Sequence, residues 1–163
     1  MRAAASKIVT RDVLREKLPE HKRRGQRIVF ANGCFDILHI GHIRYLEGAR
    51  NEGDILVVGV NMDSSVCALK GPGRPVLHEG ARAQLVASLK SVDYVVLFPE
   101  PNVESLLEVL RPDVHAKGTD YTPDTVPERA AAAELGIRVA IVGDRKDHST
   151  RELFESIRKA PHV

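Results

Sequence analysis

Two histidines three positions apart are the residues of this chain whose types and spacing point most directly to chemistry. They stand in the segment His39-Ile40-Gly41-His42, between an apolar run and a helical pattern. At a helix start, two imidazole rings lie beside backbone amides and the positive end of the helix dipole. Gly41 permits close approach of backbone to an anion, and imidazole N–H groups can donate to phosphate oxygens. The segment therefore predicts a phosphate cradle whose work is electrostatic.

Three other interpretations of this segment stay open on the motif alone: surface histidines, a metal site and a cysteine nucleophile. Zinc needs further ligands, and no metal-ligand spacing is formed by the remaining histidines, which are His21, His78, His115, His148 and His162. The sequence places no base beside Cys34, and phosphate transfer needs no protein nucleophile. We therefore interpret Cys34 as a small loop residue.

The composition is that of an ordinary globular domain. The chain has 163 residues, of which 43% are hydrophobic and 28% charged. Its apolar runs are all much shorter than the ~20 residues of a membrane span, and its start lacks the pattern of a secretory signal. Two cysteines, Cys34 and Cys67, cannot form a disulfide framework. We expect a cytoplasmic protein with no membrane partner.

Positive charge is concentrated at the start of the chain. Residues 1–27 hold nine of the 24 Lys and Arg residues but three of the 22 Asp and Glu residues. A helical pattern runs from Asp12 to Arg23 and ends at Gly25, so we expect a basic leader helix within residues 1–25, followed by one domain over 26–163. Because no aromatic residues alternate with these charges, we interpret them as a solvated face and expect no nucleic-acid partner.

Apolar runs alternate with helical patterns in the rest of the chain. The runs predict strands over 27–31, 54–60, 93–98, 113–116 and 137–142. The patterns predict helices over 41–52, 62–69, 79–89, 102–110 and 127–135, and a last helix from Ser149, where Ser149 and Glu152 match a capping box. This alternation predicts an α/β fold with a Rossmann-like, doubly wound parallel sheet of five strands and helices on both faces.

Polar residues follow the strands, where ligands of such sheets bind. Asn61 ends the second predicted strand, Lys117 and Gly118 end the fourth, and Asp120 comes next. Turn formation is the alternative explanation for Asn61, Gly118 and Asp120. Two loops rich in glycine and proline, 70–78 and 117–123, are candidates for closing over a substrate.

The segment from Gly33 to Arg50, Gly-Cys-Phe-Asp-Ile-Leu-His-Ile-Gly-His through Tyr-Leu-Glu-Gly-Ala-Arg, resembles the nucleotidyltransferase family whose signature is His-x-Gly-His. Later segments resemble, in order, the branch of that family that makes ADP-activated heptose: Asn61-Met62-Asp63, Leu69-Lys70-Gly71, Arg74-Pro75-Val76, Arg82, Lys117 to Tyr121, and His148-Ser149-Thr150. The resemblance covers residues 26–158. The basic leader resembles the form of these enzymes that is not fused to a sugar kinase.

The resemblance implies transfer of AMP from ATP to D-glycero-β-D-manno-heptose 1-phosphate, with release of pyrophosphate. The sugar phosphate would attack the α-phosphorus in line, while Mg²⁺ and positive side chains neutralise the growing charge. No covalent enzyme intermediate is needed. A homodimer is the family's usual state and is expected here.

The resemblance also implies roles for particular residues. Catalytic groups that act on the phosphates would be His39, His42, Lys70, Ser149 and Thr150. Nucleotide contacts would come from Asn32, Gly33, Cys34, Phe35, His39, Gly41, His42, Asn61, Lys117, Gly118, Asp120, Ser149 and Thr150. Sugar-phosphate contacts would come from Asp36, Lys70, Arg74 and Arg82. Asp36 would orient the loop or touch the metal, with a simple loop cap as the alternative. The alternative interpretation of Arg82 is a solvated surface charge. The alternative for Arg74 is that its loop only closes over the site.

Two departures and two rival functions limit the assignment. Thr119 stands where related enzymes have glycine, and Arg151 stands where they have threonine. Thr119 calls into question the backbone conformation beside the base, and Arg151 adds a positive charge. The rivals are a glycerol 3-phosphate cytidylyltransferase and a nucleotide-binding module without turnover. The loop Asn32-Gly33-Cys34 and the later Arg-Pro-Val favour the heptose branch.

Overall fold

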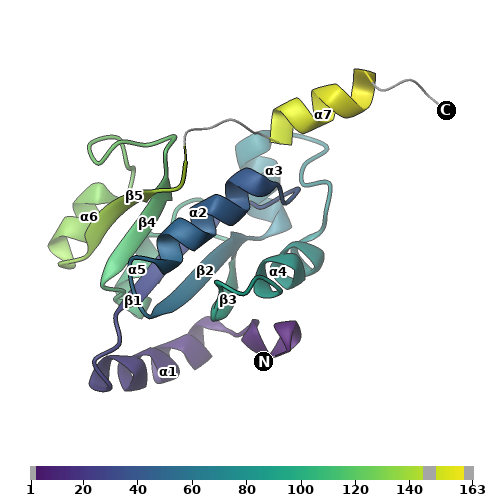
Figure 1. Ribbon diagram of the computed structural model, residues 1–163. Helices are drawn as coiled ribbons and strands as arrows, with labels where there is room; N and C mark the ends of the chain where they lie inside the picture. The colour runs from purple at the N-terminus through teal and green to yellow at the C-terminus, as the bar shows by residue number, and fades with distance from the viewer. Residues whose placement is uncertain (1–2, 145–149, 160–163) are drawn as a thin grey trace.

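The computed structural model describes residues 3–144 and 150–159. Its five strands are β1 (Ile28–Gly33), β2 (Ile55–Asn61), β3 (Tyr94–Phe98), β4 (Val114–Gly118) and β5 (Arg138–Val142). They form one parallel sheet in the order β3-β2-β1-β4-β5, with β1 at its centre (Figure 1). The predicted fold class is confirmed.

Helices connect the strands, and the strands and helices follow one another in the predicted order. They are η1 (Ala4–Lys7), α1 (Arg11–Arg23), α2 (Ile40–Arg50), α3 (Asp63–Lys70), α4 (Glu79–Ala87), α5 (Glu104–Leu110), α6 (Arg129–Glu134) and α7 (Thr150–Lys159). Each predicted strand and helix is present, with ends that differ from the prediction by no more than two residues.

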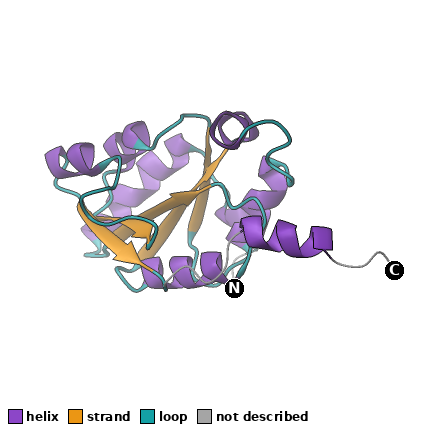
Figure 2. Ribbon diagram, turned by 90° about the horizontal axis from the view of Figure 1, so that it is seen from above, coloured by secondary structure: helices purple, strands orange, loops and turns teal. Residues whose placement is uncertain are grey.

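Helices cover both faces of the sheet, which accounts for strands that read as unbroken apolar runs (Figure 2). On one face, α2 and α4 bury Leu46 and Val86 against the sheet. On the other, α1, α5 and α6 bury side chains that include Leu18, Leu107 and Ala132. The two faces thus have separate cores on either side of β1.

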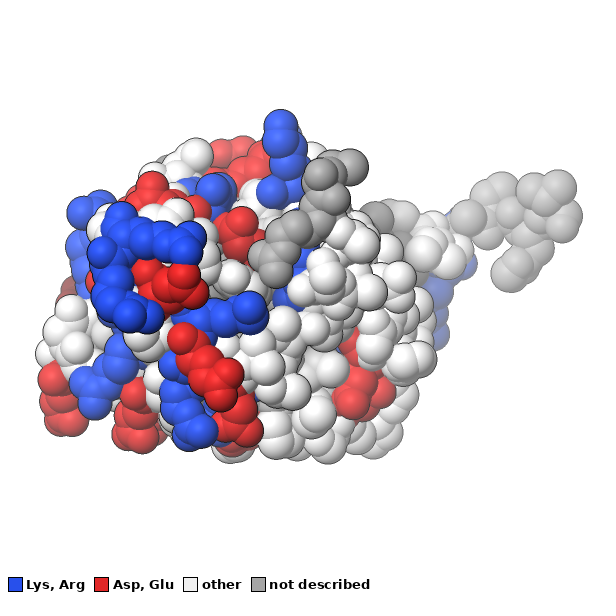
Figure 3. All heavy atoms as spheres, turned by 90° about the horizontal axis from the view of Figure 1, so that it is seen from below, with Lys and Arg blue, Asp and Glu red and all other residues white. Residues whose placement is uncertain are grey.

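The basic leader forms a helix that packs on the sheet. Thr10 caps it by accepting a hydrogen bond from the backbone N–H of Val13, at 3.3 Å. Leu14 and Leu18 on its inner side are fully buried. Its outer side carries both signs of charge, with ion pairs Arg15–Asp12, Arg24–Glu20 and Lys22–Asp113. Figure 3 shows Lys and Arg lying next to Asp and Glu on this face.

Helix α2 lies directly on the backbone that follows β5. A Cβ atom at Gly48 would come within 2.9 Å of the backbone nitrogen of Gly143. Gly143 itself has a φ of +91°, and a Cβ atom there would come within 3.2 Å of the Cα of Tyr45. Glycine is needed at both positions for this close approach. The contact sets the start of α2 above the carboxyl ends of β1 and β4.

Helix α7 extends away from the rest of the molecule (Figures 1 and 2). Its residues Glu155–Lys159 are exposed. Within the described ranges, every helix is too short or too polar to cross a membrane.

Candidate active site

A cavity of about 650 Å³ opens at the carboxyl edge of the sheet. It spans β1 and β4, between which the strand order changes direction, as is usual for ligand sites in sheets of this type. Its size falls within the range of small-molecule pockets. The predicted site residues that line it are Asn32, Gly33, Cys34, Phe35, Asp36, His39, Gly41, His42, Asn61, Lys70, Lys117, Gly118 and Asp120.

The two histidines of the motif lie together at the start of α2. His39 is the N-cap residue and His42 is in the first turn, so both side chains project on the same side. Their ring centroids are 3.9 Å apart with an interplanar angle of 34°, and the ring of Phe35 packs against His42 at 5.2 Å. Two imidazoles therefore face the cavity beside the positive end of the helix dipole.

A buried ion pair forms the wall of the cavity at the end of β4. The ammonium group of Lys117 lies 3.3 Å from Oε2 of Glu128, and both side chains are almost fully buried. The same ammonium lies 4.7 Å from the centre of the Tyr121 ring. Sequence reasoning identified Lys117 but missed Glu128 and Tyr121. Glu128 carries no motif, and only the folded connection between β4 and α6 brings it to Lys117.

Tyr45 fills the gap where β1 and β4 separate. The pairing of these strands ends at Ala31 and Ala116. Beyond it, the Tyr45 hydroxyl donates to the carbonyl of Ala116 at 2.9 Å and accepts from the backbone N–H of Asn32 at 3.3 Å. Burial raises the pKa of this hydroxyl, so it stays protonated. Tyr45 lines the cavity and replaces the missing strand-to-strand hydrogen bonds.

We expect Tyr45→Phe to lower the free energy of unfolding by about 1–2 kcal/mol, because the substitution removes a hydroxyl that serves two buried backbone groups. Urea unfolding monitored by circular dichroism measures the change. Tyr121→Phe is the matched control, since Tyr121 contacts Lys117 through its ring. Equal stability of Tyr45→Phe and the wild type would contradict this role.

Cys34 lies in the loop after β1 and lines the cavity. Burial raises the pKa of its thiol, although the positive charges of Lys70 and Arg82 act in the opposite direction. The thiol is therefore protonated at neutral pH, whereas a nucleophilic cysteine acts as thiolate. Its Sγ lies 3.9 Å from Oδ1 of Asn61, as a weak donor. These observations favour the interpretation of Cys34 as a loop residue.

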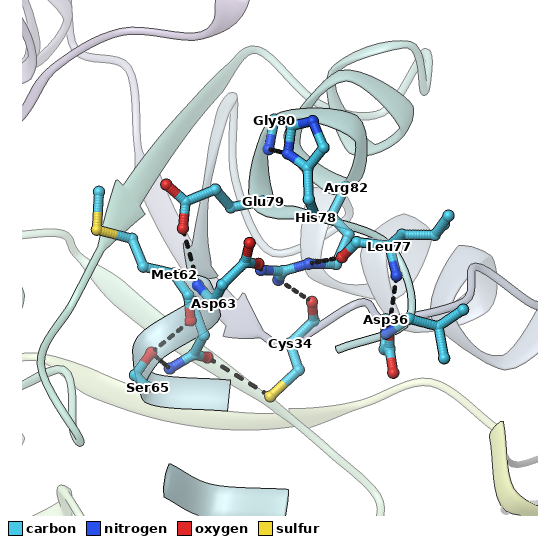
Figure 4. A network of polar contacts seen from close by, with 12 residues as sticks. Cys34, Asp36, Met62, Asp63, Ser65, Leu77, His78, Glu79, Gly80 and Arg82 are labelled. Carbon is cyan, nitrogen blue, oxygen red and sulfur yellow. Dashed lines mark hydrogen bonds and ion pairs between the residues drawn. The ribbon is translucent and has the colours of Figure 1, made fainter. Parts of the chain in front are cut away.

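Arg82 lies outside the cavity lining. Figure 4 shows its side chain directed toward Cys34, Asp63 and Leu77. The side chain is fully buried, and its guanidinium donates to the carbonyls of Leu77 and Cys34 at 2.8 and 2.6 Å and to Oδ1 of Asp63 at 2.7 Å. In this structure Arg82 therefore binds the protein's own carbonyls and Asp63, and its contact with a substrate phosphate stays a prediction. Arg82 joins α4 to the loop after β1, where Phe35 has a φ of +48°.

Asp36 holds the loop that contains Arg74. Its Oδ2 accepts from Arg74 at 2.8 Å, and its Oδ1 accepts from the backbone N–H groups of Val76 and Leu77 at 2.7 and 3.2 Å. The side chain of Asp36 is fully buried. Both oxygens are thus engaged within the protein, as the loop-holding alternative for Asp36 expects, and its contact with a metal or a sugar phosphate stays a prediction. Arg74 lies outside the cavity lining, and its contact with the substrate stays a prediction.

Burial of Asp36 opposes its ionisation, but the hydrogen bonds from Arg74, Leu77 and Val76 outweigh burial and lower the pKa of the carboxyl. A carboxyl with a lowered pKa stabilises the fold above its unfolded pKa, and that contribution is lost as the pH falls through the folded pKa. We expect Asp36→Asn to lower the unfolding free energy by about 2 kcal/mol at pH 7. The difference in unfolding free energy between the wild type and Asp36→Asn should become smaller below about pH 4, which is near the ordinary pKa of an aspartate side chain.

Urea unfolding of wild type and Asp36→Asn at several pH values between 3 and 8 tests this, with Asp12→Asn on the exposed side of α1 as the control. A stability difference that does not depend on pH would contradict the proposed role of the ionised carboxyl.

The remaining predicted positions lie at the edge of the described structure. Thr119 donates a hydrogen bond through Oγ1 to the carbonyl of Asp144, at 2.7 Å. Among the described residues, the non-glycine positions with positive φ are Phe35 and Arg111, so threonine fits the backbone at position 119. Ser149 lies outside the described residues, and Thr150 begins α7.

Comparison with known proteins identifies close relatives. The chain is 48% identical over 155 residues to the bifunctional protein HldE of Methylobacillus flagellatus, and 46% identical over 152 residues to that of Syntrophotalea carbinolica. These matches cover 95% and 93% of this chain but 32% and 31% of the relatives. The chain thus spans about a third of the length of these curated relatives.

Solved structures show the same architecture. The lipopolysaccharide core biosynthesis protein from Thermoplasma volcanium is 30% identical, with a TM-score of 0.63, over 75% of this chain and all of that chain. Pantothenate synthetase from Thermus thermophilus is 22% identical, with a TM-score of 0.62, over 95% of this chain and 71% of that one, which shows the fold alone.

A family model described as cytidylyltransferase-like matches residues 30–159, from the middle of β1 to the end of α7. This range includes the histidine pair, the ends of all five strands and every segment that lines the cavity. The chain therefore belongs to the cytidylyltransferase-like family.

Proposed function

We propose that this protein transfers AMP from ATP to D-glycero-β-D-manno-heptose 1-phosphate. The observation that carries the proposal is the pair His39 and His42, stacked at the start of α2 and facing a cavity at the carboxyl edge of the sheet. The similarity to HldE proteins over nearly the whole chain supports the choice of sugar, because ADP-activated heptose is the product that the sequence resemblance implies.

The reaction is a single in-line displacement. An oxygen of the sugar phosphate forms a bond to the α-phosphorus of ATP, and the bond from that phosphorus to the bridging oxygen of the β-phosphate breaks. Pyrophosphate leaves with the bonding electron pair. Negative charge grows on the non-bridging and leaving oxygens, and catalysis consists of positioning the reactants and stabilising this charge.

Three positive or hydrogen-bonding groups are available for that work. His39 and His42 would donate to the triphosphate from the first turn of α2. Lys70, at the end of α3, lies on the cavity wall and would meet either the leaving pyrophosphate or the incoming sugar phosphate. The ammonium of Lys117 is held by Glu128, which suits it to a neutral part of the nucleotide such as the ribose.

Magnesium enters this scheme as part of the substrate Mg–ATP. The described residues contain no cluster of three or more side chains suited to hold a metal ion, and Asp36 already binds the 74–77 loop. Mg²⁺ is commonly bound by substrate phosphates and water together with one or two carboxylates. Charge neutralisation by the protein therefore falls mainly to His39, His42 and Lys70.

Pyrophosphate release tests the proposal, measured with ATP or CTP, each paired with heptose 1-phosphate or glycerol 3-phosphate. We expect turnover with ATP and heptose 1-phosphate. Turnover only with CTP and glycerol 3-phosphate would assign the chain to the cytidylyltransferases of that substrate. Nucleotide binding without turnover in any pair would identify a binding module.

A further inference from the structure

His115 lies in the core of the sheet, next to Asn32 of the cavity wall. It is on β4, is fully buried, and packs against Phe30 of β1 with ring centroids 5.7 Å apart. Its Nε2 is 3.1 Å from Oδ1 of Asn32, which lines the cavity. A histidine outside the cavity thus contacts a residue of the cavity wall.

The protonation state of His115 follows from its surroundings. Burial lowers the pKa of His115 to about 3, and the positive charge of Lys117 acts in the same direction, so the ring is neutral. Nδ1 is buried and has no hydrogen-bond partner among the described residues. A buried N–H without an acceptor is rarer in proteins than an unfilled acceptor. The single proton therefore resides on Nε2, where Oδ1 of Asn32 accepts it.

This hydrogen bond determines which end of the Asn32 amide is available to a ligand. With Oδ1 bound to His115, the NH₂ group is the end left for the cavity. The opposite tautomer of His115 would turn the amide over and present an acceptor instead. The cavity is proposed to hold a nucleotide, whose phosphate and ribose oxygens are acceptors.

We infer that His115 is a positioning residue that fixes the Asn32 amide so that its NH₂ group donates to an acceptor oxygen of the bound nucleotide. The inference rests on the proposed function, because it takes the nucleotide as ligand. It assigns His115 no contact with the reacting atoms.

A double-mutant cycle tests this inference through direct binding of Mg–ATP to the full chain, measured by calorimetry. We expect Asn32→Ala and His115→Leu each to weaken binding by about five- to tenfold, as for loss of one hydrogen bond. The double variant should bind as weakly as Asn32→Ala alone, because His115 acts only through Asn32. Additive losses would overturn the inference.

The variant Asn32→Asp tests whether residue 32 presents a hydrogen-bond donor or an acceptor to the cavity. The carboxylate keeps an oxygen for His115 but places a second oxygen where the NH₂ group was. We expect Mg–ATP to bind Asn32→Asp more weakly than Asn32→Ala, since an anion then faces the phosphates. Binding equal to wild type would show that Asn32 presents an acceptor, and would overturn the inference.

Val139→Ala is the control for loss of core packing. Val139 lies opposite His115 on β5 and packs against the same core. The Val139→Ala variant should have lower thermal stability than the wild type but should bind Mg–ATP as tightly as the wild type does. In steady-state assays His115→Leu should raise KM for ATP with kcat nearly unchanged. Failure of the wild type to bind Mg–ATP would contradict the proposed function, whereas wild-type binding with additive losses contradicts only the role of His115.

Discussion

His39→Ala and His42→Ala are each expected to lower kcat/KM for pyrophosphate release by about 10²–10³, the usual cost of removing one preorganised donor from a transition-state site. Each ring is held by stacking on the other and by the start of α2, so its N–H groups are in place before the reaction begins. The loss should appear mainly in kcat, because the charge on the phosphates is greatest in the transition state.

Ile40→Ala is the matched control for both variants. Ile40 lies between the histidines in the same turn and is 41% exposed. It should keep near wild-type turnover and stability. His39→Ala should still bind Mg–ATP, measured by calorimetry. Turnover retained within a few-fold in both histidine variants would remove the basis of the proposed mechanism.

Arg82→Met is expected to lower the free energy of unfolding by about 3 kcal/mol, because it leaves two half-buried carbonyls without donors and Asp63 without its partner. Asp63 remains partly exposed, so water compensates for part of the lost ion pair. Turnover should fall too, since the carbonyl of Cys34 is one of the groups released. Urea unfolding and pyrophosphate release measure the two effects.

Arg82→Lys sharpens this test. A lysine keeps the charge but cannot make the three separate bonds of the guanidinium. We expect it to be nearly as unstable as Arg82→Met. Arg15→Met, on the exposed side of α1, should be as stable as wild type. If Arg82→Met were stable and lost only affinity for the sugar phosphate, the predicted contact between Arg82 and that phosphate would be confirmed.

The fold could be predicted because its signals are local. Residues 55–60 of β2 are buried on both faces and are therefore apolar throughout. Helices such as α5 repeat Leu106, Leu107 and Leu110 on the side that packs on the sheet. The position of β4 beside β1 depends on contacts between distant segments, and no short pattern specifies it.

The site was predictable where side chains lie at strand ends or helix starts, as for His39 and Lys117. The roles of Arg82 and Asp36 could not be settled from the sequence, because a charged residue near a phosphate motif is equally suited to bind a ligand or to hold a loop. Only burial and the partners of each charged group distinguish the two. Tyr45 and His115 were missed because their partners lie 71 and 83 residues away in the sequence.

The bare backbone contact between Gly48 and Gly143 makes the placement of the histidines depend on two positions that carry no functional group. A single methyl group at residue 48 would wedge α2 away from β5 and misalign both rings. Substitution at either position would thus appear as an enzymatic defect in a chain whose site residues are all intact. Redesign of the site for other ligands should leave the contact between these two glycines unchanged and vary the cavity wall around Lys70.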